Sequence, residues 1–386
     1  MLVAPGGTIT LIHSQDTADV ARRLRGWLQV AGEVEHVDLK HVNESNPTSI
    51  ARAVKERLTA VPRPRVGLNY TGGTKAMSVH AYRTIEQLSK ETNSFLVFSY
   101  LDARELALVI NFIDPALGES AHTVYVGRAL DLRLGDLLSL HGWTPRHPPT
   151  LAPLLSDSAH ILARICGDDV AFGEWMQWID DELRPKCRRT DKEDWKNKTQ
   201  LKAITLTWPT SDGLQEVVNS ICLELNMPRN NLTLEHSAFD YEPKRFCEWI
   251  FGKWLEHYVL DVLKKLPASL CLHECMQNIV PNEVEFDVDV MALHSYQLFA
   301  FSCSTDSKKS LLKLKLFEAF VRARQLGGDE ARMALICCSD SPEELEQQMR
   351  RDLGSEGQIR VFGRKSLPNF SIHLSNWIQS QIGEAR

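Results

Sequence analysis

The sequence has no CxxC pair, although nine of its 386 residues are cysteines. The closest cysteines are Cys271 and Cys275 in one place and the adjacent Cys337 and Cys338 in another, and neither spacing is that of a zinc ribbon. The thirteen histidines include no HxH or HxxxH pair. Free thiols in this number are typical of a reducing cytosol, so we expect a cytoplasmic protein without a structural zinc site.

The sequence also lacks the long apolar runs that membrane-spanning helices need. The N-terminal segment MLVAPGGTITLIHS has neither the basic start nor the long apolar stretch of a signal peptide. Positive charge is not in excess, because 44 Lys and Arg face 50 Asp and Glu and the formal net charge is −6. We therefore expect no membrane partner, and any nucleic-acid site has to be a local basic patch.

Strand and helix patterns alternate through residues 1–132. Apolar runs predict strands at 8–14, 34–39, 65–70, 94–102 and 105–112. Amphipathic periodicity predicts helices at 17–32, 47–61 and 74–90, the second of them capped by Thr48 or Ser49. This alternation is typical of a doubly wound, Rossmann-like parallel sheet, an α/β fold that binds ligands at the carboxyl ends of its strands.

The pattern changes in residues 133–229, which contain several prolines and then dense charges of both signs. We expect a mainly helical connecting module there. The alternative is a nucleic-acid-binding arm built on Lys186, Arg188, Arg189 and Lys192.

Residues 230–386 again mix helix and strand patterns, which predicts a separate C-terminal α/β domain. The predicted elements are a helix at 246–266, a hairpin at 283–305 with its turn near His294 and Ser295, a helix at 310–327 and a strand at 331–339. Gly327 and Gly328 are expected to end the second helix.

The stretch from Asn69 to Lys75, Asn-Tyr-Thr-Gly-Gly-Thr-Lys, lies between the third predicted strand and the third predicted helix. Glycines at such a junction let backbone N–H groups approach a ligand closely, and a helix N-terminus favours negative charge. The segment is neither a Walker loop nor a GxGxxG motif, which argues against a dinucleotide-dependent enzyme. Two interpretations remain: Gly72 and Gly73 form a phosphate site, or they only allow a tight turn.

This segment resembles the ligand-binding motif of CARF domains, the CRISPR-associated Rossmann fold. The resemblance implies a sensor of the cyclic oligoadenylates made by type III CRISPR complexes, with cyclic tetra-adenylate as the activating ligand. It also implies a homodimer that holds one ligand across its two-fold axis. The implied ligand-binding residues are Ser14, Gln15 and Thr17 after the first strand and Asn69, Thr71, Gly72, Gly73, Thr74 and Lys75 after the third. Alternatively, Ser14 or Thr17 only caps the helix that follows.

Residues 230–386 resemble the PD-(D/E)XK nuclease domain that one branch of CARF proteins carries at its C-terminus. The resemblance implies a restriction-endonuclease-like fold, with Glu256 as the helix glutamate and Asp289 as the metal-binding aspartate. Such nucleases hold Mg²⁺ or Mn²⁺ on carboxylates, and a lysine stabilises the charge that develops as the phosphodiester is cut. The implied activity is ligand-activated cleavage of DNA or RNA.

The E-x-K motif of that family is missing, because Ser302 and Ser304 occupy its two charged positions. One hypothesis is a displaced catalytic site whose added groups are Glu285, Asp287, Asp306 and Lys308, with Asp287, Asp289 and Asp306 on the metal. Against it, four residues along a strand span roughly 13 Å, and the alternative places Asp306 in a turn and Lys308 at a solvated helix start. The second hypothesis is a ligand-gated protein that binds nucleic acid or a partner without cleaving it.

Overall fold

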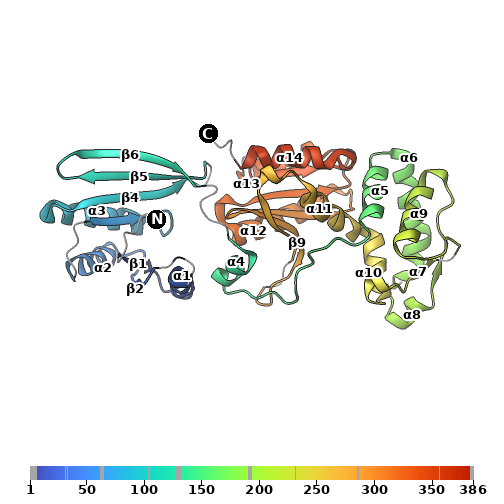
Figure 1. Cartoon of the computed structure of the whole chain (residues 1–386), viewed down its shortest axis with the longest axis horizontal. Helices are drawn as coiled ribbons and strands as arrows, with labels where there is room; N and C mark the ends of the chain where they lie inside the picture. Colours follow the sequence, from blue (N-terminus) through green and yellow to red (C-terminus); the bar gives the residue numbers. More distant parts are fainter. Residues whose placement is uncertain are drawn as a thin grey trace. The chain divides into compact units, whose positions relative to one another are not determined.

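The structure is a computed structural model that describes residues 7–30, 32, 34–60, 65–102, 105–126, 132–189, 194–230, 232–284, 287–355 and 357–382. The chain is a mixed α/β protein with several small sheets (Figure 1). It divides into two compact units, unit 1 (Met1–Thr144) and unit 2 (Pro145–Arg386). Each unit has its own hydrophobic core. None of the described helices is long and apolar enough to cross a membrane.

In unit 1, the described strands form two small sheets. The first pairs β1 (Thr8–His13) with β2 (His36–His41) in parallel. The second has the order β3-β4-β5-β6, formed by Arg65–Asn69, Phe95–Asp102, Ala107–Asp114 and Gly118–Tyr125. β3 and β4 are parallel, whereas β5 and β6 continue the sheet antiparallel. The predicted strands are present, but in the described residues they form two parallel pairs with an antiparallel extension instead of one parallel sheet.

The helices α1 (Ala18–Val30), α2 (Pro47–Ala60) and α3 (Lys75–Thr92) confirm the three that the sequence predicts, and α4 (Leu134–His141) follows them. The apolar residues of α2 recur at helical spacing, so they form one face. Ile50 of this face and Leu96 and Phe98 of β4 are each at most 1% exposed. This packing makes the core of unit 1.

The predicted cap of α2 at Thr48 or Ser49 is wrong. The side chain of Asn46 caps the helix, because its Oδ1 accepts hydrogen bonds from the backbone N–H groups of Thr48 (3.0 Å) and Ser49 (3.1 Å). Asn46 precedes Pro47, and proline is favoured at the first position of a helix. The predicted cap, even at Thr48, lies two positions beyond the observed one. The sequence did not separate them because Asn, Pro, Thr and Ser, the residues at 46–49, all suit a helix start.

The sheet of unit 2 has the order β13-β12-β11-β10-β9, formed by Ile359–Phe362, Arg332–Cys337, Gln297–Ser304, Val288–His294 and Leu272–Ile279. β10 and β11 form the predicted hairpin, and Ser295 in its turn has a left-handed backbone (φ 55°). β11, β12 and β13 are parallel to one another. Both faces of β10 and β11 are largely buried, as their apolar runs predict.

Unit 2 also has ten α-helices in its described residues. They are α5 (Ser156–Cys166), α6 (Asp169–Trp178), α7 (Arg184–Cys187), α8 (Lys198–Lys202), α9 (Gln215–Glu224), α10 (Pro243–Glu248), α11 (Trp254–Lys265), α12 (Lys309–Gly327), α13 (Pro342–Leu353) and α14 (Phe370–Gln381). A π-helical turn, η4 (Trp249–Lys253), joins α10 to α11. The predicted helix at 246–266 is therefore one helical segment with a π turn in it, and α12 ends at Gly328 (φ 69°) as expected.

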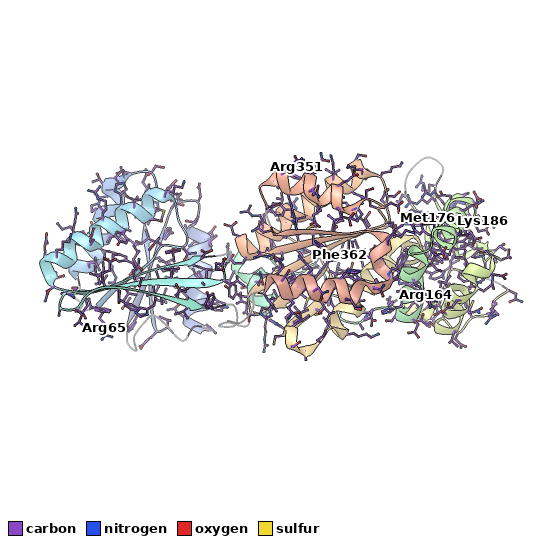
Figure 2. The ribbon with its side chains drawn as sticks, turned by 90° about the horizontal axis from the view of Figure 1, so that it is seen from above. Arg65, Arg164, Met176, Lys186, Arg351 and Phe362 are labelled. Atoms are coloured by element: carbon purple, nitrogen blue, oxygen red, sulfur yellow. The ribbon has the colours of Figure 1, made fainter. Side chains whose placement is uncertain are left out.

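One hydrophobic core joins the middle of the chain to the C-terminal sheet, with members from Leu155 to Ile378. Figure 2 shows Met176 on the helices beside the sheet that carries Phe362. A polar contact links the same two segments, because the buried guanidinium of Arg364 donates to the carbonyl of Cys166 (3.0 Å). Residues 145–229, the larger part of the predicted connecting module (133–229), thus pack as part of unit 2, whereas residues 133–144 belong to unit 1.

The shared core predicts that residues 145–386 fold as an isolated fragment and residues 230–386 do not. The shorter fragment would lose the ring contacts of His160 with Tyr258 and of Trp195 with Phe251. Circular dichroism during heating checks this, since the longer fragment should melt in one cooperative transition. An equally cooperative transition in the shorter fragment would show that residues 230–386 fold without the middle segment.

Candidate functional site

Hydrogen bonds hold the carboxyl ends of β1, β2, β3 and β4 together at one edge of unit 1. After β2, the N–H of Val42 donates to the carbonyl of His13 at the end of β1 (2.9 Å). In the loop after β3, Thr74 Oγ1 donates to the carbonyl of Glu44 (3.2 Å), and Thr71 Oγ1 accepts from the N–H of Leu101 in β4 (2.8 Å). The glycine loop predicted from the sequence lies at this edge, which is where sheets with parallel strands bind ligands.

The glycine loop ends at the N-terminus of α3, and its residues 71–75 are all exposed. Gly73 has φ +88°, a conformation that disfavours any residue with a Cβ. Thr74 caps α3, because its Oγ1 accepts a hydrogen bond from the backbone N–H of Met77 (3.2 Å). The exposed loop backbone and Lys75 therefore lie at the positive end of an 18-residue helix.

Asn69 and Thr71 shape this loop. Asn69 Oδ1 accepts from the N–H of Thr71 (3.2 Å), and its Nδ2 donates to Ser99 Oγ (3.2 Å). Thr71 Oγ1 accepts from the backbone of β4, which leaves its hydroxyl proton to be donated outward. Asn69 is thus placed to position the loop, whereas Thr71 both positions it and presents a donor.

In the loop after β1, Ser14 and Thr17 form the helix-capping hydrogen bonds that were one of the two interpretations of these residues. Thr17 Oγ1 accepts from the N–H of Ser14 (3.0 Å), Ser14 Oγ accepts from the N–H of Thr17 (3.3 Å), and the two hydroxyl oxygens lie 3.0 Å apart. Ser14 is buried, while Gln15 and Thr17 are exposed. These bonds fix the turn that starts α1 and leave Gln15 as the exposed amide in it.

In unit 2, Glu256 on α11 and Asp289 on β10 lie close enough to affect each other's charge. The pKa of Glu256 is raised to about 8, first by burial and then by the negative charge of Asp289, with a smaller effect from Asp287. Burial likewise raises the pKa of Asp289. Neighbouring acids withdrawn from water are costly unless a cation compensates them, and such pairs concentrate at functional sites.

The hairpin places Ser302 opposite Asp289. The register pairs Val290 with Phe301, so the next pair outward is Asp289 with Ser302. Asp289 Oδ2 accepts hydrogen bonds from Ser302 Oγ (3.2 Å) and from the backbone N–H of Cys303 (2.7 Å). Ser302 therefore orients the aspartate and does not add a carboxylate to the site.

Asp306 and Lys308 lie in the turn between β11 and α12. The Oδ1 of Asp306 accepts from the backbone N–H groups of Ser307 (3.0 Å) and Lys308 (3.2 Å), and Lys308 is exposed just before the helix starts. Asp287 is exposed near the start of β10, where its charge raises the pKa of both Glu256 and Asp289. Glu285 lies outside the described residues. The turn at Asp306 is the arrangement that the sequence offered against a displaced site.

Lys315 on α12 is a charged residue of this site that the sequence reasoning missed. Its Nζ donates a hydrogen bond to the carbonyl of Cys303 (2.9 Å), the residue between the two serines. Its positive charge lowers the pKa of both Asp289 and Glu256. A lysine on the helix directly after the motif strand was the available signal, because that helix packs on the strand.

The π turn before α11 brings a second cation to the site. Lys253, its last residue, lowers the pKa of Glu256, and its ammonium lies 3.7 Å from a carboxylate oxygen of Glu248. π turns inside helices are rare and frequent at functional sites. Periodicity at 3.6 residues per turn does not reveal such a turn, so the sequence reasoning missed this one as well.

The basic residues of the middle segment take part in contacts within unit 2. Lys186 forms an ion pair with Glu182. The guanidinium carbon of Arg188 lies 4.4 Å from the ring centroid of Phe251, a cation–π distance. Lys192 lies outside the described residues. The alternative of a nucleic-acid arm stays a prediction.

The carboxylates of unit 2 suit a hard divalent cation. No group of three or more His, Cys, Asp or Glu within the described ranges is placed to hold a metal ion. Mg²⁺, however, commonly binds through one or two carboxylates together with water and substrate phosphates. Glu256 and Asp289 fit this donor set, because both offer oxygen ligands and a bound cation would compensate for the withdrawal from water that raises both pKa values.

No protein-family model and no curated protein matches this sequence. Among solved structures, the chain matches Can2 from Sulfobacillus thermosulfidooxidans in complex with cyclic tetra-adenylate (cA4), with a TM-score of 0.62 and 17% identity, over 96% of this chain and 90% of that one. It also matches a type III CRISPR defence DNA nuclease activated by cyclic oligoadenylate, with a TM-score of 0.44 and 16% identity, over 86% of this chain and 41% of that one. The chain thus has the fold of Can2 over nearly its whole length.

The pair of half-buried acids, Glu256 and Asp289, predicts that Glu256→Gln raises the melting temperature of the metal-free protein, because an amide needs no compensating charge. A gain of about 1 kcal/mol corresponds to roughly 2–4 °C in a protein of this size. Thermal melts in EDTA measure it. Adding Mn²⁺ should then stabilise the parent protein and leave the variant unchanged.

Asp306→Asn is the matched comparison, since Asp306 carries the same charge in the turn after β11. Its Mn²⁺ response should equal that of the parent protein. If the response survives in Glu256→Gln and disappears in Asp306→Asn, the metal binds at the displaced site and the pairing of Glu256 with Asp289 is not its ligand set.

Proposed function

We propose that this chain is an accessory effector of type III CRISPR defence that senses a cyclic oligoadenylate with unit 1 and cleaves nucleic acid with unit 2. The observation that carries the proposal is the convergence of Glu256, Asp289 and Lys315 in a chain with the fold of Can2. The fold alone is an argument by analogy. The convergence adds the charges that metal-dependent phosphodiester cleavage needs.

The proposed sensor site is the carboxyl edge of unit 1. Backbone N–H groups of Gly72 and Gly73, the hydroxyl of Thr71 and the ammonium of Lys75 would contact the phosphates of cyclic tetra-adenylate. Gln15, exposed after β1, would contact a base or ribose, while Ser14, Thr17, Asn69 and Thr74 hold the loops in place. The proposed assembly is a homodimer with the ligand on its two-fold axis, and binding favours the cleaving state over the resting one.

The proposed catalytic site holds Mg²⁺ or Mn²⁺ on Glu256 and Asp289, with Asp287 at its rim. The ion would polarise the scissile phosphate of DNA or RNA and lower the pKa of the attacking water. Ser302 and the N–H of Cys303 keep Asp289 oriented toward the ion. Lys315 takes the part of the missing E-x-K lysine, because its ammonium can leave the Cys303 carbonyl for the phosphoryl oxygens.

A second candidate function is ligand-gated binding without cleavage. Serines at 302 and 304 favour it, since the motif strand supplies neither a carboxylate nor an ammonium. It requires the same sensor and the same fold. The two functions differ in whether Lys315 and Glu256 change a cleavage rate, which makes Lys315 the discriminating residue.

Lys75→Ala should weaken the binding of cyclic tetra-adenylate at least about tenfold, because it removes a charge directed at phosphate. Gly73→Val should do the same, because a β-branched residue does not adopt φ +88° without strain. Calorimetry measures both. Lys90→Ala, at the opposite end of α3, is the control and should bind as the parent does. If the parent protein and the three variants all bind the ligand with equal affinity, the glycine loop is only a turn and not a ligand site.

Lys315→Met should lower the rate of cleavage of plasmid or RNA by about 10²–10³-fold in the presence of Mn²⁺ and cyclic tetra-adenylate, the usual cost of losing a group that stabilises transition-state charge. Lys308→Met tests the displaced site and should keep the parent rate, as should Lys313→Met on the same helix. If Lys308→Met loses cleavage activity and Lys315→Met keeps it, the catalytic lysine is Lys308 and not Lys315. An inert parent would support the binding-only function.

A further inference from the structure

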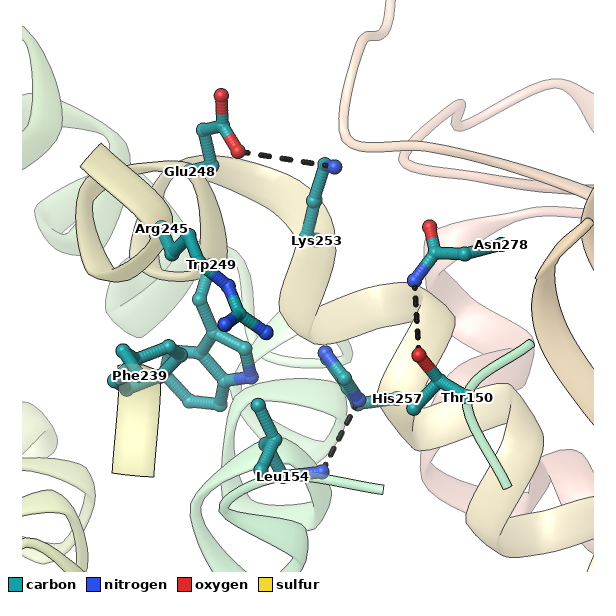
Figure 3. A pocket seen from close by; sticks show the side chains of 9 residues that line it. All are labelled: Thr150, Leu154, Phe239, Arg245, Glu248, Trp249, Lys253, His257 and Asn278. Atoms are coloured by element: carbon teal, nitrogen blue, oxygen red, sulfur yellow. Dashed lines mark hydrogen bonds and ion pairs between the residues drawn. The ribbon is translucent and has the colours of Figure 1, made fainter. Parts of the chain in front are cut away.

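A cavity of about 70 Å³ lies beside the carboxylate site of unit 2 (Figure 3). Its wall is formed by α10, the π turn η4 and α11 on one side and by the segment from Thr150 to Leu154 on the other. One water needs about 10–15 Å³ by this measure. The cavity therefore has room for a cluster of a few waters or for one small polyatomic ion.

The side chains that line this cavity are mainly hydrogen-bond donors. Arg245 and Lys253 bring two cations, and Asn278 brings an amide whose Nδ2 makes only a long contact with Thr150 Oγ1 (3.4 Å). The one carboxylate in the wall is that of Glu248, which lies 3.7 Å from the Lys253 ammonium, while Arg245 forms an ion pair with Asp240 outside the wall. A site with this composition attracts an acceptor of hydrogen bonds that carries negative charge.

Trp249 gives an independent indication of a ligand. Its side chain is 1% exposed, and its indole Nε1 is a buried donor without a hydrogen-bond partner. Figure 3 shows this nitrogen directed toward the space between Arg245 and His257. A buried N–H without an acceptor costs about 1–3 kcal/mol, so this N–H requires an acceptor atom, which a water or an oxyanion supplies and a cation does not.

The cavity is connected to the carboxylate site through Lys253. This lysine lines the cavity and also lowers the pKa of Glu256. The two residues are three positions apart at the start of α11, a rise of about 4.5 Å along the helix. An anion in the cavity and a phosphate at the carboxylates would thus share one cation between them.

We propose that this cavity is an oxyanion site, in which Arg245, Lys253 and Trp249 bind a phosphate group of the substrate strand next to the phosphate that is cut. The assignment to a nucleic-acid phosphate rests on the proposed nuclease function, whereas the oxyanion chemistry does not. A free phosphate ion has the same chemistry, and the test separates the two sources. The site would hold the strand in register while the carboxylates act on the neighbouring link.

The test compares full-length variants in a buffer with Ca²⁺ and cyclic tetra-adenylate. Arg245→Gln removes a cation, and Trp249→Phe removes the indole N–H and keeps an aromatic ring. Fluorescence anisotropy of a labelled 20-nucleotide DNA or RNA, measured over a series of salt concentrations, gives the affinity. Each variant should bind about five- to tenfold more weakly, and Arg245→Gln should reduce the salt slope by about one.

Arg324→Gln is the matched control, because Arg324 pairs with an aspartate five residues away, as Arg245 does with Asp240. It should keep the affinity and slope of the parent. Thermal melts of each variant confirm that it is folded, and Arg245→Gln alone suffices should Trp249→Phe be unstable. Calorimetry with inorganic phosphate then reports whether the cavity binds the free ion.

The outcomes separate cleanly. Weaker strand binding in Arg245→Gln and Trp249→Phe, but not in Arg324→Gln, supports the substrate site even if the parent cleaves nothing. Phosphate binding that both variants lose, with strand binding unchanged, keeps the oxyanion site and overturns its role in the substrate. If both variants bind the strand as the parent does and the parent binds no inorganic phosphate, the proposal is overturned, even if the protein is an active nuclease.

Discussion

The proximity of two half-buried acids, Glu256 and Asp289, is the constraint on which the rest of unit 2 depends. Withdrawal from water raises the pKa of both, and the charge of Asp289 makes Glu256 harder still to ionise. Around them the fold places what such a pair requires: backbone and hydroxyl donors on Asp289, Lys253 before Glu256 and Lys315 on the next helix. The tightly packed core behind α11 supplies the stability that such a pair lowers.

Apolar patterns predicted most of the strands and helices of residues 1–132 and, in residues 230–386, the hairpin with the helices on either side of it, because burial decides where such elements form. The hairpin of β10 and β11 has its turn where the sequence predicted it. β6 was missed because all eight of its residues are exposed, so that no apolar alternation marks it. The sequence could not show that the middle segment shares the core of unit 2, because an apolar pattern shows that a face is buried but not which element buries it.

The candidate sites were predictable to different degrees for a physical reason. The glycine loop is local, so its turn, its cap at Thr74 and the helix behind it follow from adjacent residues. The proposed carboxylate site is assembled from α11, β10 and α12, and Lys315, the lysine that we propose for it, lies on α12, where no spacing rule applies. The E-x-K motif describes one strand, whereas the chemistry requires only that an ammonium reaches the place where charge develops.

The central claim is that Glu256 and Asp289 share one divalent cation beside Lys315. A crystal soaked in Mn²⁺ tests it most directly, because anomalous scattering locates the metal without reference to any activity. We expect one strong peak within about 2.0–2.3 Å of a carboxylate oxygen of each acid, a distance typical of small divalent ions bound by oxygen. A peak at Asp306 with none between Glu256 and Asp289 would contradict the account.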